Sequence, residues 1–264
     1  KILVLTLEAV LPRKETETAD AEAKNTVSTT REELYNDIVK NAHSDSTYLL
    51  LVFLSTVVVA IGLLEDNVAV VIGAMVIAPL LGPNIALALG AALGDMPLMW
   101  KAIKTTIVGI ALALSLSVVL GMIYPFNLDS HELMARTDVG LDSVALALAS
   151  GAAAVISLTT GLASVLVGVM VAVALLPPTA TLGLMIGAGQ SKLAVGAALL
   201  LAVIIVCVNL AAKIVFWVRG VKPRSWLEKQ KANQSMVTYL VIWVLSLTFL
   251  VVVIFIRKGL LKGF

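Results

Sequence analysis

The sequence is short of charge. Only 14% of its 264 residues are Asp, Glu, Lys or Arg, whereas 59% are hydrophobic and the mean hydropathy is +1.01. A soluble domain is typically about one quarter charged, so the composition predicts an integral membrane protein in contact with the lipid bilayer. The formal net charge of +2 is too small to indicate a nucleic-acid partner.

Residues with catalytic or metal-binding chemistry are equally scarce. The single cysteine, Cys207, stands inside an apolar run, which excludes a disulfide framework and a cysteine metal site. His43 and His131 fall outside the apolar runs, and the sequence has no HExxH, GxSxG or P-loop pattern. ALGD at 92–95 lacks the first glycine of the intramembrane aspartyl-protease pattern GxGD. We therefore expect no enzyme activity, no cofactor and no metal site.

Long apolar runs make up most of the remaining sequence. Each has roughly the 20 residues that one membrane crossing needs. The predicted fold is an all-α integral membrane protein with about seven transmembrane segments. They cover residues 46–64, 68–93, 102–125, 143–159, 163–189, 193–217 and 236–256.

The N-terminal part differs from these segments. Within residues 1–12, every second position from 3 to 11 is apolar (Leu3, Leu5, Leu7, Ala9 and Leu11), which predicts the remnant strand of a truncated soluble domain. The polar stretch 13–29 predicts a flexible linker, and Thr30-x-x-Glu33 is a capping box that opens an amphipathic helix over 30–43. The rest divides into a first membrane repeat (46–126), an acidic loop (127–142), a second membrane repeat (143–218), a basic cytoplasmic loop (219–235) and an additional transmembrane helix with a tail (236–264).

The apolar segments contain an internal repeat. Shifted by 95 positions, GAMVIAPLLGPNIALALGAALG at 73–94 aligns with GVMVAVALLPPTATLGLMIGAG at 168–189, and Gly, Met and Pro recur in register. The period covers three segments. If each segment crosses the membrane, the two copies are inverted repeats, as in many secondary transporters. If 68–93 and 163–189 are re-entrant hairpins instead, the copies run parallel.

Prolines interrupt the second and fifth segments. A proline inside a helix costs about 3 kcal/mol, and a bilayer offers no water to replace the lost hydrogen bond. We expect Pro83 and Pro178 each to begin a second half-helix, whose free amides suit an anion or a carboxylate. Kinks that serve only helix packing are the alternative. The predicted solute- or ion-binding residues are Pro79, Gly82, Pro83, Asn84, Pro177, Pro178, Thr179 and Thr181.

Four other polar residues are secondary candidates. Glu65 and Asp66 lie between the first two segments, where a solvated turn is the alternative to an ion gate. Lys213 lies in the sixth segment with Asn209 one turn away. A charge inside the membrane indicates function, unless the side chain snorkels to the nearby cytoplasmic edge.

The distribution of basic residues predicts the orientation. With seven crossings, most of the lysines and arginines lie on the N-terminal side of the membrane, which the positive-inside rule assigns to the cytoplasm. We expect a multi-pass protein of the cell inner (cytoplasmic) membrane. Small residues at Gly90-x-x-x-Gly94 and Gly183-x-x-x-Gly187 predict close helix packing, within one chain or in a homodimer.

Taken together, these features resemble the prokaryotic membrane-protein family known as domain of unknown function 389. The resemblance rests on TREELYNDIVKNA (30–42), AIGLLEDNVAVVIGAMVIAPLLGPNIALALG (60–90) and ALLPP (174–178). Members often have a soluble domain before the linker, which agrees with the expected strand remnant. The family supplies no established activity, so function is inferred from the residues.

Two functions are compatible with the sequence. The first is a transporter or channel for a small solute or ion, with an anion or neutral solute favoured, because the breaks contain no acidic residue for a proton relay. The alternative is a membrane sensor or scaffold coupled to an N-terminal soluble ligand-binding domain. A transport pathway requires Asn84, Thr179 and Thr181 to line a wet cavity, whereas in a scaffold they are dry and satisfied by neighbours.

Overall fold

The computed structural model describes residues 35–36, 38–39, 42–124, 130–160, 175–219 and 226–262. The chain divides into two units, Lys1–Asn36 and Asp37–Phe264, and every helix named below belongs to the second. The predicted strand, linker and capping box lie outside the described residues. Ile38 and Val39, within the helix predicted over 30–43, are helical.

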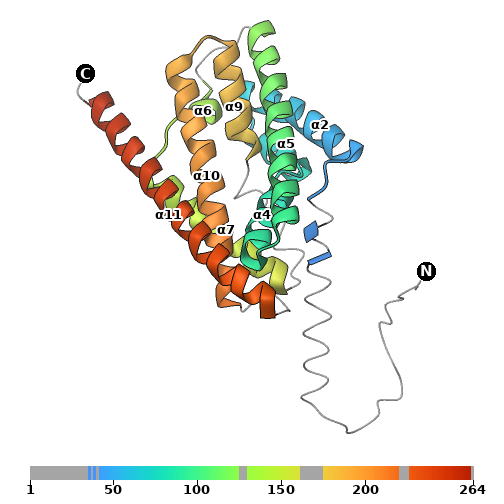
Figure 1. Cartoon of the computed structure of the whole chain (residues 1–264). Helices are drawn as coiled ribbons and strands as arrows, with labels where there is room; N and C mark the ends of the chain where they lie inside the picture. Colours follow the sequence, from blue (N-terminus) through green and yellow to red (C-terminus); the bar gives the residue numbers. More distant parts are fainter. Residues whose placement is uncertain are drawn as a thin grey trace. The chain divides into compact units, whose positions relative to one another are not determined.

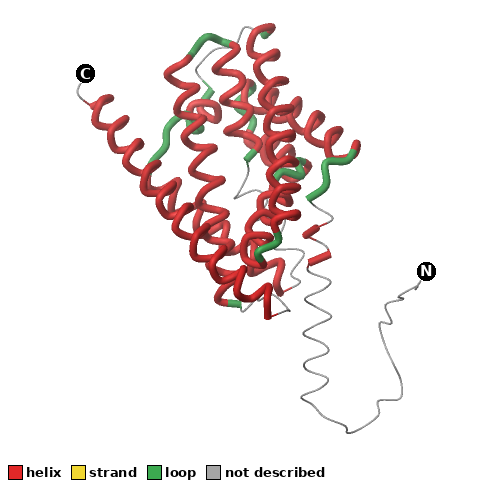
Figure 2. The backbone as a smooth tube through the Cα atoms, viewed as in Figure 1, coloured by secondary structure: helices red, strands yellow, loops and turns green. Residues whose placement is uncertain are grey.

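The described residues form helices and connecting loops, without a strand (Figure 2). The helices, drawn in Figure 1, are α2 (Ser46–Leu64), α3 (Val68–Ile77), α4 (Leu81–Leu93), α5 (Met96–Ile123), α6 (His131–Met134), α7 (Leu141–Thr160), α9 (Leu176–Gly187), α10 (Ser191–Val218) and α11 (Trp226–Lys262).

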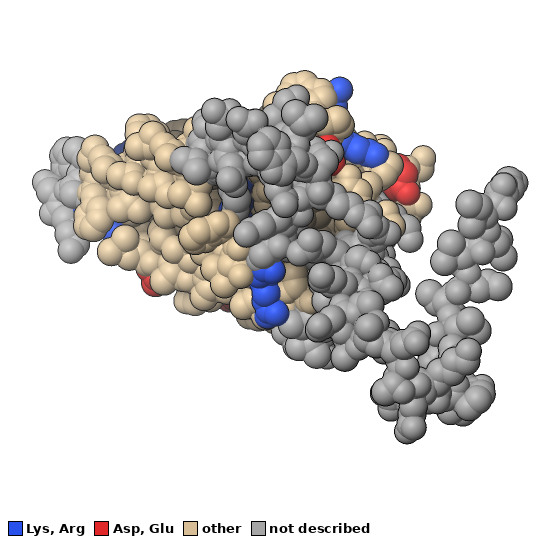
Figure 3. All heavy atoms as spheres, turned by 60° about the horizontal axis from the view of Figure 1, so that its bottom comes forward, with Lys and Arg blue, Asp and Glu red and all other residues tan. Residues whose placement is uncertain are grey.

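Five of the described helices are long and apolar enough to cross a membrane, and the number is six if the bent pair α3 and α4 counts as one span. This fits a multi-pass membrane protein. Five predicted segments therefore correspond to helices, and the ends agree to within six residues except at the start of α11, which lies ten residues earlier than predicted. The predicted segment 163–189 is described only from residue 175. In the view of Figure 3, most of the described surface is uncharged.

Short polar side chains begin three of these helices. Asp45 Oδ1 accepts a hydrogen bond from the Tyr48 amide at 2.8 Å, Asn67 Oδ1 from Val70 at 3.2 Å, and Asp95 Oδ1 from Leu98 at 3.0 Å. Each side chain satisfies an amide that has no acceptor inside the helix. The third predicted segment starts at Met96 rather than 102, because Asp95 caps the helix before the apolar run begins.

Helix boundaries recur with the spacing of the sequence repeat. The helices α5 and α10 have 28 residues each, and their bounds differ by 95 positions (96 to 191 and 123 to 218). The same offset separates the first residues of α4 and α9, at 81 and 176. The turns after α4 and α9 contain glycines 95 positions apart with left-handed backbone, Gly94 at φ 72° and Gly189 at φ 71°. Local structure therefore follows the repeated sequence.

Four helices pack in a closed ring. α5 packs against α4 and α9, and α10 packs against the same two helices from the other side. Outside this ring, α2 packs on α3, α5 and α9, while α7 and α11 pack on α10. The C-terminal helix α11 begins at Trp226, inside the stretch predicted as a basic loop over 219–235.

Glycines allow α9 to approach α5 closely. A methyl group added at Gly183 of α9 would lie 2.8 Å from Leu114 O and 3.0 Å from Val118 N of α5. One added at Gly187 would lie 2.9 Å from Met122 N. The predicted close packing at Gly183-x-x-x-Gly187 is therefore confirmed within one chain. At the other predicted pair, Gly94 instead supplies the left-handed residue that ends α4.

Candidate functional site

The second predicted segment is broken where its prolines indicated. α3 ends at Ile77, α4 begins at Leu81, and the two helices are bent by 49°. Pro79 lies in the break, and Ala78 before it has an extended backbone with φ −71° and ψ 119°. A residue before proline is driven out of the helical region, so Pro79 accounts for the end of α3.

The second half-helices start earlier than predicted. They begin at Leu81 and Leu176, so Pro83 and Pro178 are third residues rather than first. The preceding residues already have right-handed backbone, with φ and ψ of −77° and −21° at Leu80 and of −79° and −24° at Leu175. The amides of a first helical turn have no acceptor inside the helix, so proline is tolerated throughout that turn. Gly82 and Pro177 lie in these same turns.

The start of α4 lies beside the middle of α5. A methyl group added at Gly109 would lie 2.8 Å from Cδ2 of Leu80, the residue that precedes α4. The turn at Gly94 then reverses the chain, and a methyl group added at Gly90 would lie 3.1 Å from the amide nitrogen of Met99, at the start of α5. α4 and α5 therefore run in opposite directions.

The start of α9, like that of α4, lies beside the middle of α5. Gly183 contacts α5 at Leu114 and Ser117, and four residues later Gly187 contacts it at Val118 and Gly121. The two helices therefore run in the same direction. Leu176 is about two turns before Gly183, which puts the start of α9 near the centre of α5. Figure 1 shows α9 beside the upper part of α5 and α4 lower down.

Two buried asparagines join α4 to α10. Asn84, in the first turn of α4, is 1% exposed and Asn209 on α10 is fully buried. Nδ2 of Asn209 donates a hydrogen bond to Oδ1 of Asn84 and another, at 2.9 Å, to the carbonyl of Ile205. The structure thus brings together a primary and a secondary candidate from the sequence.

Each helix of the ring also has a buried polar atom without a hydrogen-bond partner among the described residues. These atoms are Asn84 Nδ2 on α4, Ser117 Oγ on α5, Thr181 Oγ1 on α9 and Asn209 Oδ1 on α10. Leaving such a group unpaired costs about 1–3 kcal/mol, so each one favours a site for water or solute. Thr179 differs, because its hydroxyl donates to the Leu175 carbonyl at 2.7 Å.

Lys213 does not snorkel, contrary to one of the two sequence interpretations. Its side chain is fully buried, and Nζ lies 5.5 Å from the centre of the Trp243 ring on α11. Long side chains on a helix point toward its N-terminus, here toward the turn of Asn209 and away from the helix end at Val218. Among the described residues, Lys213 is the one buried charged side chain.

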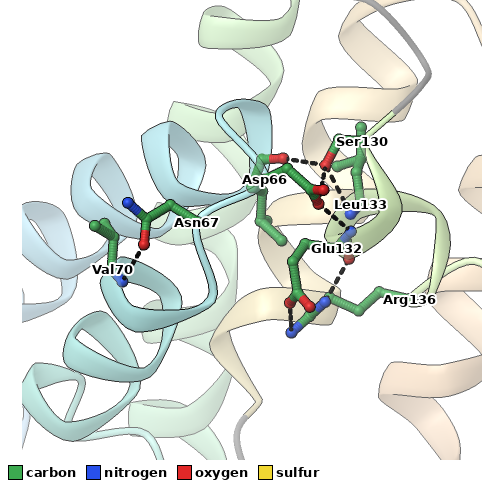
Figure 4. A network of polar contacts seen from close by, with 8 residues as sticks. Asp66, Asn67, Val70, Ser130, Glu132, Leu133 and Arg136 are labelled. Carbon is green, nitrogen blue, oxygen red and sulfur yellow. Dashed lines mark hydrogen bonds and ion pairs between the residues drawn. The ribbon is translucent and has the colours of Figure 1, made fainter.

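Asp66 joins the turn between α2 and α3 to the loop around α6 (Figure 4). Its Oδ1 accepts from the Glu132 amide at 2.6 Å and from Ser130 Oγ at 3.2 Å, and Ser130 Oγ lies 2.6 Å from the carbonyl of Leu63. Glu132 is paired with Arg136 at 2.7 Å. These contacts favour a structural role for Asp66 over an ion gate. Glu65 beside it is exposed.

Two residues of this region were missed by sequence reasoning. Ser117 is one of several hydroxyls in its segment, and only the contact of α5 with Gly183 distinguishes it. Nothing in the sequence distinguishes Trp243 from other aromatic residues of a membrane span. Its contact with Lys213 depends on how α11 packs on α10. In the part of the chain that the structure describes, no group of three His, Cys, Asp or Glu could hold a metal ion.

Comparison with known proteins identifies the family. Residues 75–210 match the family described as Domain of unknown function (DUF389). The chain is also 38% identical over 214 residues to the uncharacterized protein MJ0678 of Methanocaldococcus jannaschii, an alignment that covers 81% of this chain and 67% of that protein. No solved structure matches. The chain therefore belongs to the DUF389 family.

Proposed function

We propose that the protein is a membrane transporter or channel for a small solute or ion, with its site at the broken helices. The observation that supports this most is the start of α4 and α9 beside the middle of α5, near buried polar atoms that have no partner among the described residues. Half-helix starts near the centre of a membrane protein are typical of transporter binding sites. A bundle that serves only as a scaffold has no need of such groups.

Contacts at one end of the helices support a complete crossing by the second segment. Ser130, which follows α5, bonds to Leu63 and Asp66 at the end of α2. In this arrangement, the C-terminal ends of α2 and α5 therefore lie on the same side of the membrane. With α5 crossing the membrane, this arrangement favours a crossing by the segment of α3 and α4 over re-entry.

The same reasoning applies to the fifth segment. Arg257 near the end of α11 donates to the carbonyl of Thr137 at 3.3 Å and to that of Lys192 at 3.4 Å. Thr137 precedes α7 and Lys192 is at the start of α10, which favours a return of the chain across the membrane between α7 and α10. This return favours seven crossings with two inverted repeats, the second of which includes α9.

The antiparallel course of α4 and α9 also supports inversion. α4 is antiparallel to α5, whereas α9 is parallel to it. The two half-helices therefore extend from the centre toward opposite sides of the membrane. We further propose that the N-terminal side faces the cytoplasm of the cell inner membrane, because the basic residues concentrate there.

Flux into proteoliposomes tests the proposal. We would compare the unchanged protein with Asn84→Leu/Thr179→Val, using inorganic anions, Na⁺, K⁺, H⁺ and small carboxylates. Thr248→Val is the matched control, because Thr248 on α11 makes the same type of bond to a carbonyl, that of Val244 at 2.9 Å, but is exposed on the helix surface.

The expected result is flux of at least one species that the double variant loses and the control keeps. Flux that survives in the folded double variant would move the site away from the breaks. If no species moves, the protein is not a transporter and the sensor interpretation replaces it.

A further inference from the structure

We infer that the site binds a small anion, held between the first turn of α4 and the Asn209–Lys213 face of α10. This inference rests on the proposed function and names the substrate class of the same site. Sequence alone left neutral solutes and anions open. The structure adds the position of Lys213 and the pairing of Asn84 with Asn209.

The first turn of α4 is electropositive. A helix start has the equivalent of about half a positive charge, from amides that lack acceptors. Here no side chain caps it: Leu80 makes no capping hydrogen bond. The amide Nδ2 of Asn84 lies in that turn, is buried, and has no acceptor among the described residues. A donor without an acceptor is suited to bind an anion.

Asn209 connects this helix start to a buried cation. Its Nδ2 donates to Asn84, and Lys213 follows one turn later on α10, so both residues lie on the same side of the helix. Both are fully buried. The ammonium group of Lys213 reaches Trp243 at 5.5 Å, which keeps it inside the protein rather than at the membrane surface.

The described interior contains a basic side chain but no acidic one. It has one buried lysine, and no Asp or Glu is buried among the described residues. In a medium of low dielectric constant, a fixed positive charge and an oriented helix start favour an anion and oppose a cation. A carboxylate or a monovalent inorganic anion has acceptors for both the asparagine amide and the lysine.

Binding can be measured without transport. We would record the thermal unfolding of the protein in detergent with the sodium salts of chloride, nitrate, formate and acetate, against sodium gluconate at equal ionic strength. An anion that binds only the folded protein raises its melting temperature in a concentration-dependent way. We expect this for at least one of the four small anions.

Two lysine variants identify the site. Lys213→Met keeps length and apolar volume but removes the charge, and we expect it to weaken the apparent anion affinity at least tenfold, whereas Lys213→Arg retains most of it. Lys104→Met is the matched control, because Lys104 makes the same kind of contact with Trp100, at 5.4 Å, but is exposed. It should leave the affinity unchanged.

The outcomes separate this inference from the proposed function. Anion binding that Lys213→Met weakens, without any flux, would support the anion site and reject transport. Flux of Na⁺ or K⁺ without anion binding would reject the anion site and keep transport. Stabilisation by none of the four anions, or equal stabilisation of the unchanged protein and Lys213→Met, would overturn the inference.

Discussion

The side-chain amide of Asn209 donates a hydrogen bond to Oδ1 of Asn84 and thereby joins α10 to the first turn of α4. Both residues are buried, and each retains one polar atom without a partner among the described residues. This pair connects the break in the second segment to the helix that contains Lys213. Helix packing and the candidate site therefore depend on the same contact.

A double-mutant cycle should detect this contact. Asn209→Leu leaves Oδ1 of Asn84 buried without its donor, so we expect a loss of about 1–3 kcal/mol in the free energy of unfolding. Asn84→Leu/Asn209→Leu should lose less than the sum of the single variants, by about 0.6 kcal/mol, as is typical of side-chain hydrogen bonds between membrane helices. Unfolding in mixed detergent micelles measures these values, and strictly additive losses would show that the two amides do not interact.

The contact between α5 and α9 should tolerate no added methyl group. Gly183→Ala would place a Cβ 2.8 Å from the Leu114 carbonyl oxygen, so the helices must separate, at a cost of about 1–3 kcal/mol. Gly73→Ala is the control, because nothing lies within 4 Å of its added Cβ and alanine favours a helix over glycine by up to about 1 kcal/mol. Melting temperatures should therefore move in opposite directions, and a Gly183→Ala protein as stable as Gly73→Ala would contradict the close packing.

Asp66 should matter for its acceptor oxygen and its backbone rather than for its charge. Its φ of 55° is tolerated by Asp and Asn but strains other residues. Asp66→Asn keeps an oxygen for Ser130 and Glu132, and we expect little change in stability. Asp66→Ala removes the acceptor and adds strain, so we expect a loss of about 1–3 kcal/mol in the same unfolding assay. Equal losses in both variants would instead assign the effect to the charge.

Sequence predicted the parts of this fold that follow from local chemistry. Proline excludes a regular helix on steric grounds, so Pro79 located the break between α3 and α4 without any knowledge of packing. The start of α4 was placed two residues late, because Pro83 was taken as the first helical residue, whereas proline is tolerated at any position of a first helical turn. Met96 at the start of α5 was missed because Asp95 and the lysines after it lowered the apolar signal.

Contacts between helices could not be predicted in this way. Asn84 and Asn209 were each recognised as polar residues in apolar runs, but their pairing depends on the register between α4 and α10. Lys213 lies near the end of its helix, so distance along the sequence allowed it to reach the surface. Its burial follows from α11 and Trp243, which pack over it.

The number of crossings gives the most direct test of the architecture. In a Cys207→Ala background, which removes the buried native thiol, we would introduce Asp138→Cys, Lys192→Cys and Lys104→Cys at exposed positions. Arg257 bonds to the carbonyl of Lys192 rather than to its side chain, so this change leaves the contact in place. With seven crossings, an impermeant maleimide added outside the cell should label the cysteines at 138 and 192 but not the one at 104. A re-entrant fifth segment would put the cysteine at 192 on the same side as the one at 104. Both cysteines would then show the same labelling by the maleimide.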